Sequence, residues 1–166
     1  MQIELLTNAS HLLGTFHCSN ESIDDYFQSK ALNDVDAVTH CFIDDKSKAI
    51  IALASLSCNG IMIKSGKLLH TVPAVEIKMF AVNDCYKSKS CPIEEGYHWS
   101  DYCFDKTISI ISEFTDTYFG ASRVFLYSVP KAVGFYKRQK MDEFTELMYK
   151  DDKMYLDGCT PMFMSL

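Results

Sequence analysis

The sequence predicts an α/β protein with a mixed central sheet and helices on both faces. Segments with strand-like and helix-like patterns alternate along the chain, two neighbouring strands read as a hairpin, and one apolar segment has the composition of an interior strand. With 166 residues, 48% of them hydrophobic and 23% charged, the chain can bury one core. We therefore expect a single domain over residues 1–166.

The first half of the chain predicts a strand, a helix and a hairpin. Residues 2–7 form a short strand, and Ser22 begins a capping sequence, SIDD, for a helix. Four apolar residues of that helix fall on one face: Ile23, Tyr26, Phe27 and Ala31. Residues 37–43 and 49–57 are two antiparallel strands that the polar turn DDKSK separates.

Residues 74–82 predict a third strand in the interior of the sheet. Val75, Ile77, Met79 and Ala81 alternate with Glu76, Lys78, Phe80 and Val82. Because side chains of a strand point alternately to its two faces, this pattern places apolar residues on both faces and the two charges on one. A strand that is apolar on both faces is typical of the interior of a sheet rather than its edge.

The second half predicts two helices and three strands. After an irregular stretch from Asn83 to Trp99, Ser100 caps a long helix that Gly120 ends. The helix has apolar residues at helical spacing: Phe104, Ile108, Ile111, Phe114 and Tyr118. A strand at residues 123–127, a short helix at 130–138, and strands at 144–149 and 162–166 complete the order.

Charge and cysteine content limit the classes of function. The net charge of -6 repels polyanions and disfavours non-specific nucleic-acid binding. The sequence has neither a basic start followed by an apolar run nor an apolar stretch of bilayer length, so we expect a cytoplasmic protein without a membrane partner. Seven scattered cysteines are expected to be reduced thiols.

One group of potential zinc ligands occurs in the irregular stretch and the helix after it. Its members are Cys85, Cys91, His98 and Cys103. Thiols and imidazoles are the ligands that zinc prefers, but their spacing is not that of a CxxC pair. We therefore expect no metal site.

Three segments together resemble the GNAT superfamily of N-acetyltransferases, in the subgroup that contains toxin-like enzymes. FHCSNESIDDYF at residues 16–27 resembles the start of the first helix of that subgroup. VEIKMFAVN at residues 75–83 resembles the fourth strand of the family, and VPKAVGFYKRQKM at residues 129–141 resembles the segment whose helix carries a Phe-Tyr pair. The order of elements matches as well, so the resemblance covers most of the chain.

The resemblance implies an acetyl-CoA-dependent N-acetyltransferase. Backbone groups of the fourth strand, here Phe80, Ala81 and Val82, would bind the pantetheine of acetyl-CoA, and an amine would attack the thioester directly. Glu76 is the candidate base for the proton of the amine, and Tyr136 is the candidate acid for the departing thiolate. The alternatives are a structural ion pair of Glu76 with Lys78 or a cross-strand cation, and an ordinary packed tyrosine.

The phosphate-binding loop departs from the family pattern R/Q-x-x-G-x-G/A. The corresponding stretch is DCYKSKSCPIEEGYHWS, which contains one glycine, Gly96, and is longer than the pattern. Lys87, Ser88 and Lys89 can supply charge and donors for the diphosphate in place of the glycine amides. The acidic residues Glu94, Glu95 and Asp101 would oppose a bound anion. A second departure is Lys140, where the family usually has a glycine after the tyrosine-bearing helix.

The expected acceptor is a primary amine, either small or macromolecular. A basic cluster lies beside Tyr136 and makes tRNA one candidate: Lys131, Lys137, Arg138 and Lys140. The alternative is that these residues form a solvated helix face, and the acidic net charge favours this alternative. A homodimer is left open. The rival function is a non-catalytic GNAT-fold binding protein that has lost the phosphate loop, since fold alone does not settle activity.

Overall fold

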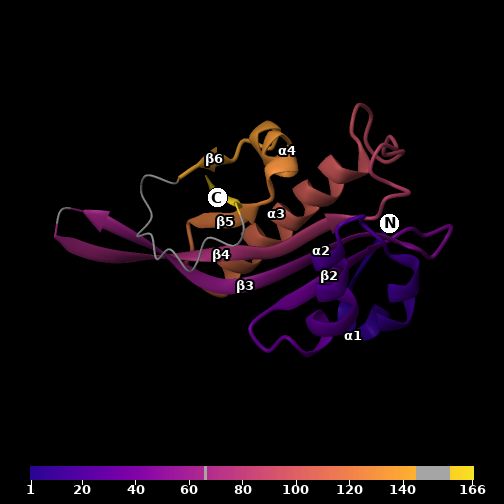
Figure 1. The fold of residues 1–166 in the computed structure, drawn as a ribbon, viewed down its shortest axis with the longest axis horizontal. Helices are drawn as coiled ribbons and strands as arrows, with labels where there is room; N and C mark the ends of the chain where they lie inside the picture. The colour runs from indigo at the N-terminus through magenta and orange to yellow at the C-terminus, as the bar shows by residue number, and fades with distance from the viewer. Residues whose placement is uncertain (66, 145–157) are drawn as a thin grey trace. The chain divides into compact units, whose positions relative to one another are not determined.

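The computed structural model describes residues 1–65, 67–144 and 158–166. The chain forms two compact units: unit 1 contains Met1–Ser57 and Lys78–Ile111, and unit 2 contains Cys58–Ile77 and Ser112–Leu166. Three elements pass through both units. They are the strands β3 (Ile50–Ser65) and β4 (Leu68–Val82) and the helix α3 (Trp99–Thr117) (Figure 1).

The strands form one seven-stranded mixed sheet in the order β1-β2-β3-β4-β5-β7-β6. The remaining strands are β1 (Gln2–Leu5), β2 (Val38–Ile43), β5 (Arg123–Ser128), β6 (Asp142–Glu143) and β7 (Thr160–Ser165). β4 pairs with β5 in parallel, whereas β1 with β2, β2 with β3, β5 with β7 and β6 with β7 are antiparallel. The mixed sheet and the interior position of residues 74–82 are confirmed.

In unit 1, helices cover both faces of the sheet. Cys41 and Ile43 of β2 belong to a core cluster with Tyr26 and Phe27, while the intervening Phe42 belongs to a second cluster with Cys103 of α3. This alternation follows from the period of a strand. The first cluster lies under α1 (Leu6–Ala9), the 3₁₀ helix η1 (Ser10–Thr15) and α2 (Glu21–Asp25), and the second lies under α3.

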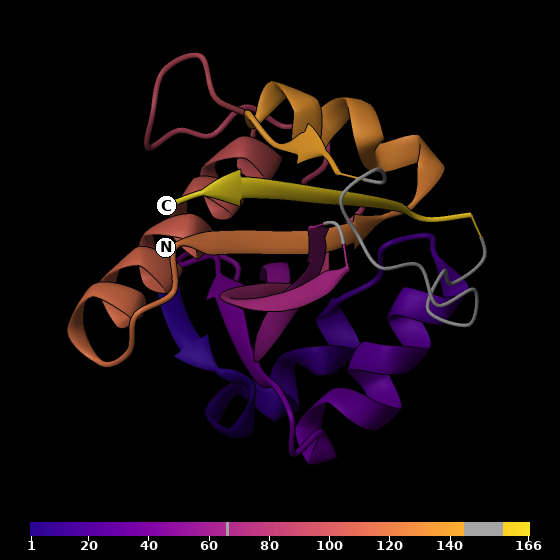
Figure 2. The ribbon, with the colours of Figure 1, turned by 90° about the vertical axis from the view of Figure 1, so that its left-hand side faces the viewer.

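Unit 2 has its own aromatic core between its strands. Phe125 of β5, Phe144 and the strand residues Ile61 and Ala74 are buried together, and Phe163 of β7 packs against them with its ring 5.2 Å from that of Phe144. β5 and β7 run side by side in opposite directions (Figure 2). The 3₁₀ helix η4 (Pro130–Ala132) and α4 (Val133–Arg138) follow β5, where the sequence predicts a short helix.

Two predicted helix starts are wrong by one or two residues. The cap of α2 is Asn20, whose side chain accepts from the amide of Ile23 at 3.3 Å, so Ser22 lies inside the helix. This helix continues as a π-helical turn, η2 (Tyr26–Lys30), and a 3₁₀ turn, η3 (Ala31–Asn33). α3 begins at Trp99, and the Asp101 carboxylate accepts from the amide of His98 at 3.2 Å in place of a cap by Ser100.

Other predicted boundaries differ in length. α3 ends at Thr117, short of Gly120, and β3 and β4 continue into residues 58–65 and 68–73, where the sequence analysis predicts no strand. Of the predicted strand 144–149, residues 145–149 lie outside the described residues and Phe144 is in no strand, while a two-residue strand, β6, precedes this range at Asp142–Glu143. In the part of the chain that the structure describes, no helix combines the length and the apolar character that a membrane span requires.

Candidate functional site

The carboxyl end of β4 lies in unit 1 with its side chains packed into the two cores. Ala81 and Val82 are buried in opposite clusters, and the half-buried Phe80 packs edge-on against Phe104 of α3, with ring centroids 5.4 Å apart. The side chains of these three residues therefore pack against other residues of unit 1. What this segment can offer a ligand is its backbone, as the resemblance implies.

Asn83 fixes the direction in which the chain leaves β4. Its buried side-chain amide donates to the carbonyls of Thr15, at 2.6 Å, and Ile50, at 2.9 Å, and its backbone amide donates to Ile51 at 2.8 Å. Its side-chain oxygen accepts from the amide of Cys85 at 3.3 Å. A residue that uses all these groups inside the fold anchors the loop that follows.

The predicted phosphate residues lie on one helical turn directly after Asn83. The amide of Lys87 donates to the Asn83 carbonyl at 3.2 Å, and the amide of Lys89 donates to the Tyr86 carbonyl at 3.1 Å. Lys87, Ser88 and Lys89 are exposed, and the Lys89 ammonium lies 5.0 Å from the centroid of the Tyr86 ring. The structure therefore brings these three residues together at the exit of β4.

Lys87 has internal partners that the sequence analysis missed. Its ammonium donates to the carbonyl of Cys18 at 2.6 Å and to the carboxylate of Asp84, which also accepts from the hydroxyl of Ser19. His17 lies beside this network. Its Nε2 atom is 4.0 Å from an oxygen of Asp84, and its Nδ1 atom is 2.5 Å from an oxygen of Asp24. The spacing of Asp84 and Lys87, three residues apart in a turn, was the one local signal for this network.

The extra length of the loop forms an excursion that closes at its base. The amide of Trp99 donates to the carbonyl of Lys89 at 3.1 Å, and the amide of Cys91 donates to the carbonyl of Tyr97 at 2.7 Å. Residues 90–98 therefore leave and return to one point, with Gly96 at a φ of 83°. Glu94 and Glu95 are exposed on this excursion, while the hydrogen bond between Lys89 and Trp99 joins the end of the turn with Lys87 to the first residue of α3.

Glu76 and Lys78 have separate partners. In unit 2, the side-chain nitrogen of Asn59 donates to Glu76 at 2.8 Å, and the amide of Gly60 donates to the Asn59 oxygen at 2.8 Å, which orients the Asn59 amide. In unit 1, the Lys78 ammonium lies 2.6 Å from Asp34. The Glu76–Lys78 ion pair weighed as an alternative is therefore wrong, because each side chain binds another residue.

Tyr136 lies buried on α4 in unit 2. Its ring packs against Phe135 with the centroids 5.1 Å apart, and 7% of the residue is exposed. Burial raises the pKa of the Tyr136 hydroxyl above its ordinary value of 10, so the group keeps its proton at neutral pH. A hydroxyl in this state can donate a proton but cannot act as a base.

The basic residues near α4 are partly engaged. Lys137 forms an ion pair with Glu143 at 2.7 Å, and the Arg138 guanidinium donates to the Gly134 carbonyl at 3.2 Å and lies over the Phe135 ring. Lys131 and Lys140 are exposed. The cluster predicted from the sequence is therefore present on the surface of unit 2, with two of its cations held by neighbours.

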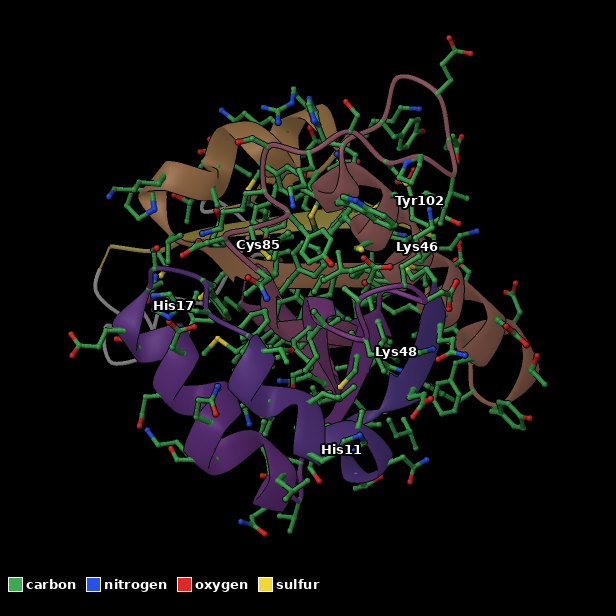
Figure 3. The ribbon with its side chains drawn as sticks, turned by 90° about the vertical axis from the view of Figure 1, so that its right-hand side faces the viewer. His11, His17, Lys46, Lys48, Cys85 and Tyr102 are labelled. Carbon is green, nitrogen blue, oxygen red and sulfur yellow. The ribbon has the colours of Figure 1, made fainter. Side chains whose placement is uncertain are left out.

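The cysteines are free thiols that are divided between core and surface. Cys91 and Cys103 are buried in the second cluster of unit 1, whereas Cys85 and His98 are exposed (Figure 3 labels Cys85). Burial raises the pKa of the Cys103 thiol, which therefore stays protonated. Within residues 1–65, 67–144 and 158–166, no group of three or more His, Cys, Asp or Glu side chains could hold a metal ion.

Comparison with known proteins supports a fold, and only solved structures match. No protein-family model and no curated protein sequence matches this chain. A tyrosine-to-phenylalanine mutant of KacT superposes with a TM-score of 0.72 at 12% identity, over 99% of this chain and 94% of the other. AtaTR bound with AcCoA gives 0.70 at 13% identity, over 99% and 92%.

AtaT complexed with acetyl-methionyl-tRNAfMet is similar to the same extent. Its TM-score is 0.72 at 14% identity, and the match covers 99% of this chain and 94% of the other. Agreement over whole chains at such low identity reports the arrangement of the elements rather than a shared site. The chain therefore adopts the GNAT fold of these toxins, as the three sequence segments predict.

Proposed function

We propose that this chain is an N-acetyltransferase that transfers an acetyl group from acetyl-CoA to a primary amine. The observation that carries the proposal is the likeness, over 99% of this chain, to AtaTR bound with AcCoA. The chain's own residues fit such a ligand. The backbone of Phe80 to Val82 would hold the pantetheine, and the exposed turn with Lys87, Ser88 and Lys89 would hold the diphosphate.

The proposed reaction needs two proton-transfer groups. The amine nitrogen attacks the thioester carbon, the C–S bond breaks, and an N–C bond replaces it. Glu76, held by the neutral amide of Asn59, takes the proton that the amine loses, either directly or through water. Tyr136, whose burial keeps its hydroxyl protonated, gives a proton to the departing thiolate.

We propose an aminoacyl-tRNA as the first acceptor to assay. AtaT has been solved with acetyl-methionyl-tRNAfMet, and this chain exposes Lys131 and Lys140 beside the helix of Tyr136. The net charge of -6 works against a large polyanion, so binding of tRNA would depend on this local patch. A small polyamine is the comparison substrate, because it presents a primary amine without phosphates.

The test is transfer of a radiolabelled acetyl group, with aminoacyl-tRNA and a polyamine in parallel reactions. Thermal unfolding is measured with acetyl-CoA alone, since a ligand at 100 times its Kd stabilises the folded state by about 2.7 kcal/mol. Binding with transfer to either amine supports the proposal, and transfer to only one of them identifies the acceptor class. Absence of both a thermal shift and transfer would overturn it.

One observation favours a second candidate, a GNAT-fold binding protein without catalysis. Lys87, the residue best placed to bind a diphosphate, already donates to Asp84 and to the Cys18 carbonyl. In this second candidate these bonds remain in place and the loop holds no acyl-CoA. The same thermal measurement separates the two candidates, because only the enzyme requires a shift with acetyl-CoA.

A further inference from the structure

Donors from two distant segments of unit 1 converge on one carboxylate. Asp84, directly after β4, accepts from the Lys87 ammonium and the Ser19 hydroxyl. The Nε2 atom of His17 lies 4.0 Å from Asp84, while its Nδ1 atom lies 2.5 Å from a second carboxylate, that of Asp24. The segments are held together independently, because the amide of Asp84 donates to the His17 carbonyl at 2.8 Å. Figure 3 labels His17 on the segment before α2 and Cys85 on the segment after β4.

The chemistry of this cluster is that of an anion site. The ammonium of Lys87 and the hydroxyl of Ser19 donate to this carboxylate, with the imidazole of His17 nearby, and such groups also bind a phosphate oxygen. The Asp84 carboxylate thus stands where an external anion would accept the same bonds. Hydrogen bonds of this kind do not depend on whether the acceptor oxygen belongs to the chain or to a ligand.

The cluster is accessible to solvent and is held in an unusual backbone conformation. The side chains of His17, Asp84 and Lys87 are 73%, 33% and 44% exposed. Ser19 has a φ of 54°, in the left-handed region that residues other than glycine rarely adopt. Such backbone strain persists where surrounding contacts impose it, and it is frequent at ligand-binding sites.

We propose that Lys87, Ser19 and His17 form an anion site that the carboxylate of Asp84 occupies from within the chain, and that the diphosphate of acyl-CoA displaces this carboxylate. The second part rests on the proposed function. The carboxylate of Asp84 then competes with the diphosphate for the same donors. The affinity for acyl-CoA is therefore lower than it would be without this carboxylate. A singly charged anion would displace it less well than a diphosphate.

The test is the Asp84→Asn variant, which keeps the size of the side chain and removes its charge. Titration calorimetry with inorganic pyrophosphate, and separately with acetyl-CoA, measures Kd. Without the competing carboxylate we expect Kd for both to fall by about fivefold or more, because one charge interaction at about 4 Å is worth about 1 kcal/mol even in bulk water. Adding Lys87→Ala to this variant should abolish the gain.

Asp25→Asn is the matched control. Asp25 carries the same charge on α2, and its carboxylate pairs with Lys30 at 2.7 Å and accepts from the hydroxyl of Ser29. Its removal changes the net charge equally but should leave Kd for pyrophosphate within about twofold, because the charge of Asp25 is already paired with Lys30 and exposed charges are screened by salt. An equal gain in both variants would show a general charge effect and overturn the proposal.

Two further outcomes complete the test. If Asp84→Asn does not fold, Lys87→Ala in the otherwise unchanged protein must weaken pyrophosphate binding, and unchanged binding overturns the site. A protein that gains pyrophosphate affinity through Asp84→Asn but transfers no acetyl group has the anion site and fails the proposed function. Transfer activity with no change of Kd in Asp84→Asn overturns the anion site and leaves the function standing.

Discussion

Single residues of unit 2, Tyr136 and Glu76, are the candidate acid and base. Tyr136 is buried beside Phe135, and burial raises the pKa of its hydroxyl, while Glu76 is half-buried and accepts a hydrogen bond from the neutral side-chain amide of Asn59. A hydroxyl and a carboxylate are the types of group that can act as acid and base in transfer from a thioester to an amine. The roles of Tyr136 and Glu76 stay predictions.

Replacement of Tyr136 by phenylalanine tests the role of the hydroxyl. The ring and its packing remain, but the proton for the thiolate is lost, so the single-turnover rate should fall about a hundredfold, the usual scale of general acid catalysis. Kd for acetyl-CoA should change far less, because the bond forms mainly as the thioester breaks. Rapid-quench measurement of acetyl transfer gives the rate, and calorimetry gives Kd.

Tyr127→Phe is the control for this variant. Tyr127 is a half-buried tyrosine of unit 2 that packs against Phe125, with ring centroids 6.0 Å apart. Loss of the Tyr127 hydroxyl should lower the free energy of unfolding by roughly 1 kcal/mol at most and leave the rate of acetyl transfer unchanged. If Tyr136→Phe behaves in the same way, with a lower melting temperature and full turnover, Tyr136 is structural.

At this scale the sequence predicts residues within a segment but not their distant partners. Lys87, Ser88 and Lys89 were expected together, and they share one turn. Cys18, whose carbonyl accepts from Lys87, is 69 residues from it, and Ser19 is 65 residues from its partner Asp84. No local pattern links positions so far apart, because only the complete fold brings them into contact.

At the scale of elements, the end of α4 has the geometry of a Schellman motif. The amide of Met141 donates to the carbonyl of Tyr136 and the amide of Lys140 to that of Lys137, both at 3.1 Å. The motif places Lys140 at a φ of 64°, a conformation that favours glycine. The departure from the family pattern at this position, noted in the sequence, is thus a lysine held in the left-handed region.

Lys140→Gly should stabilise the protein. Glycine adopts this conformation without the steric cost of a Cβ atom, about 1–2 kcal/mol, although it adds conformational entropy to the unfolded chain. The free energy of unfolding should rise by about 0.5–1 kcal/mol in urea titrations. Lys131→Gly, at a helical position of η4, should instead be destabilising, and a loss of stability in both variants would contradict the account.

The helix starts and long strands show why boundaries escaped prediction. SIDD and Ser100 both offer a capping side chain, yet Asn20 and His98 precede the helices, because the choice between nearby polar residues depends on the tertiary approach of the chain. Residues 58–73 contain two glycines and few alternating apolar residues, which is typical of a turn. A Cβ at Gly60 would lie 2.5 Å from a Thr71 side-chain atom, so close cross-strand packing explains that glycine.

For the whole molecule, buried and bonded titratable groups determine the response to acid. A hydrogen bond from Lys78 holds the pKa of Asp34 below its ordinary value of 3.8, and a bond from the backbone of Lys46 does the same for Asp44. Burial lowers the pKa of His40 below 6.5. In all three cases the unfolded chain binds protons more readily than the folded one.

Stability should therefore fall with pH in two stages. The contribution of His40 is fully present above pH 6.5 and is lost as pH falls through its lower folded pKa, because the unfolded chain becomes charged first. The contributions of Asp34 and Asp44 are present above about pH 4 and are lost below 3.8. Urea unfolding at pH 7.5, 5 and 3 measures both stages, and His40→Gln should remove the upper one. A stability that rises between pH 7.5 and 5 would contradict this assignment.

The two compact units should unfold together as the single domain predicted from the sequence. β3, β4 and α3 each pass through both units, so separate unfolding of either unit would end these elements in their middle. The backbone groups exposed at such a break lose their hydrogen bonds, which makes a partly unfolded state unfavourable. Trp99, the one tryptophan, reports on unit 1 by fluorescence, and a Trp99→Phe/Tyr127→Trp variant reports on unit 2. Their urea midpoints should each coincide with the midpoint of circular dichroism in the same protein, whereas two separated transitions would divide the chain into two domains.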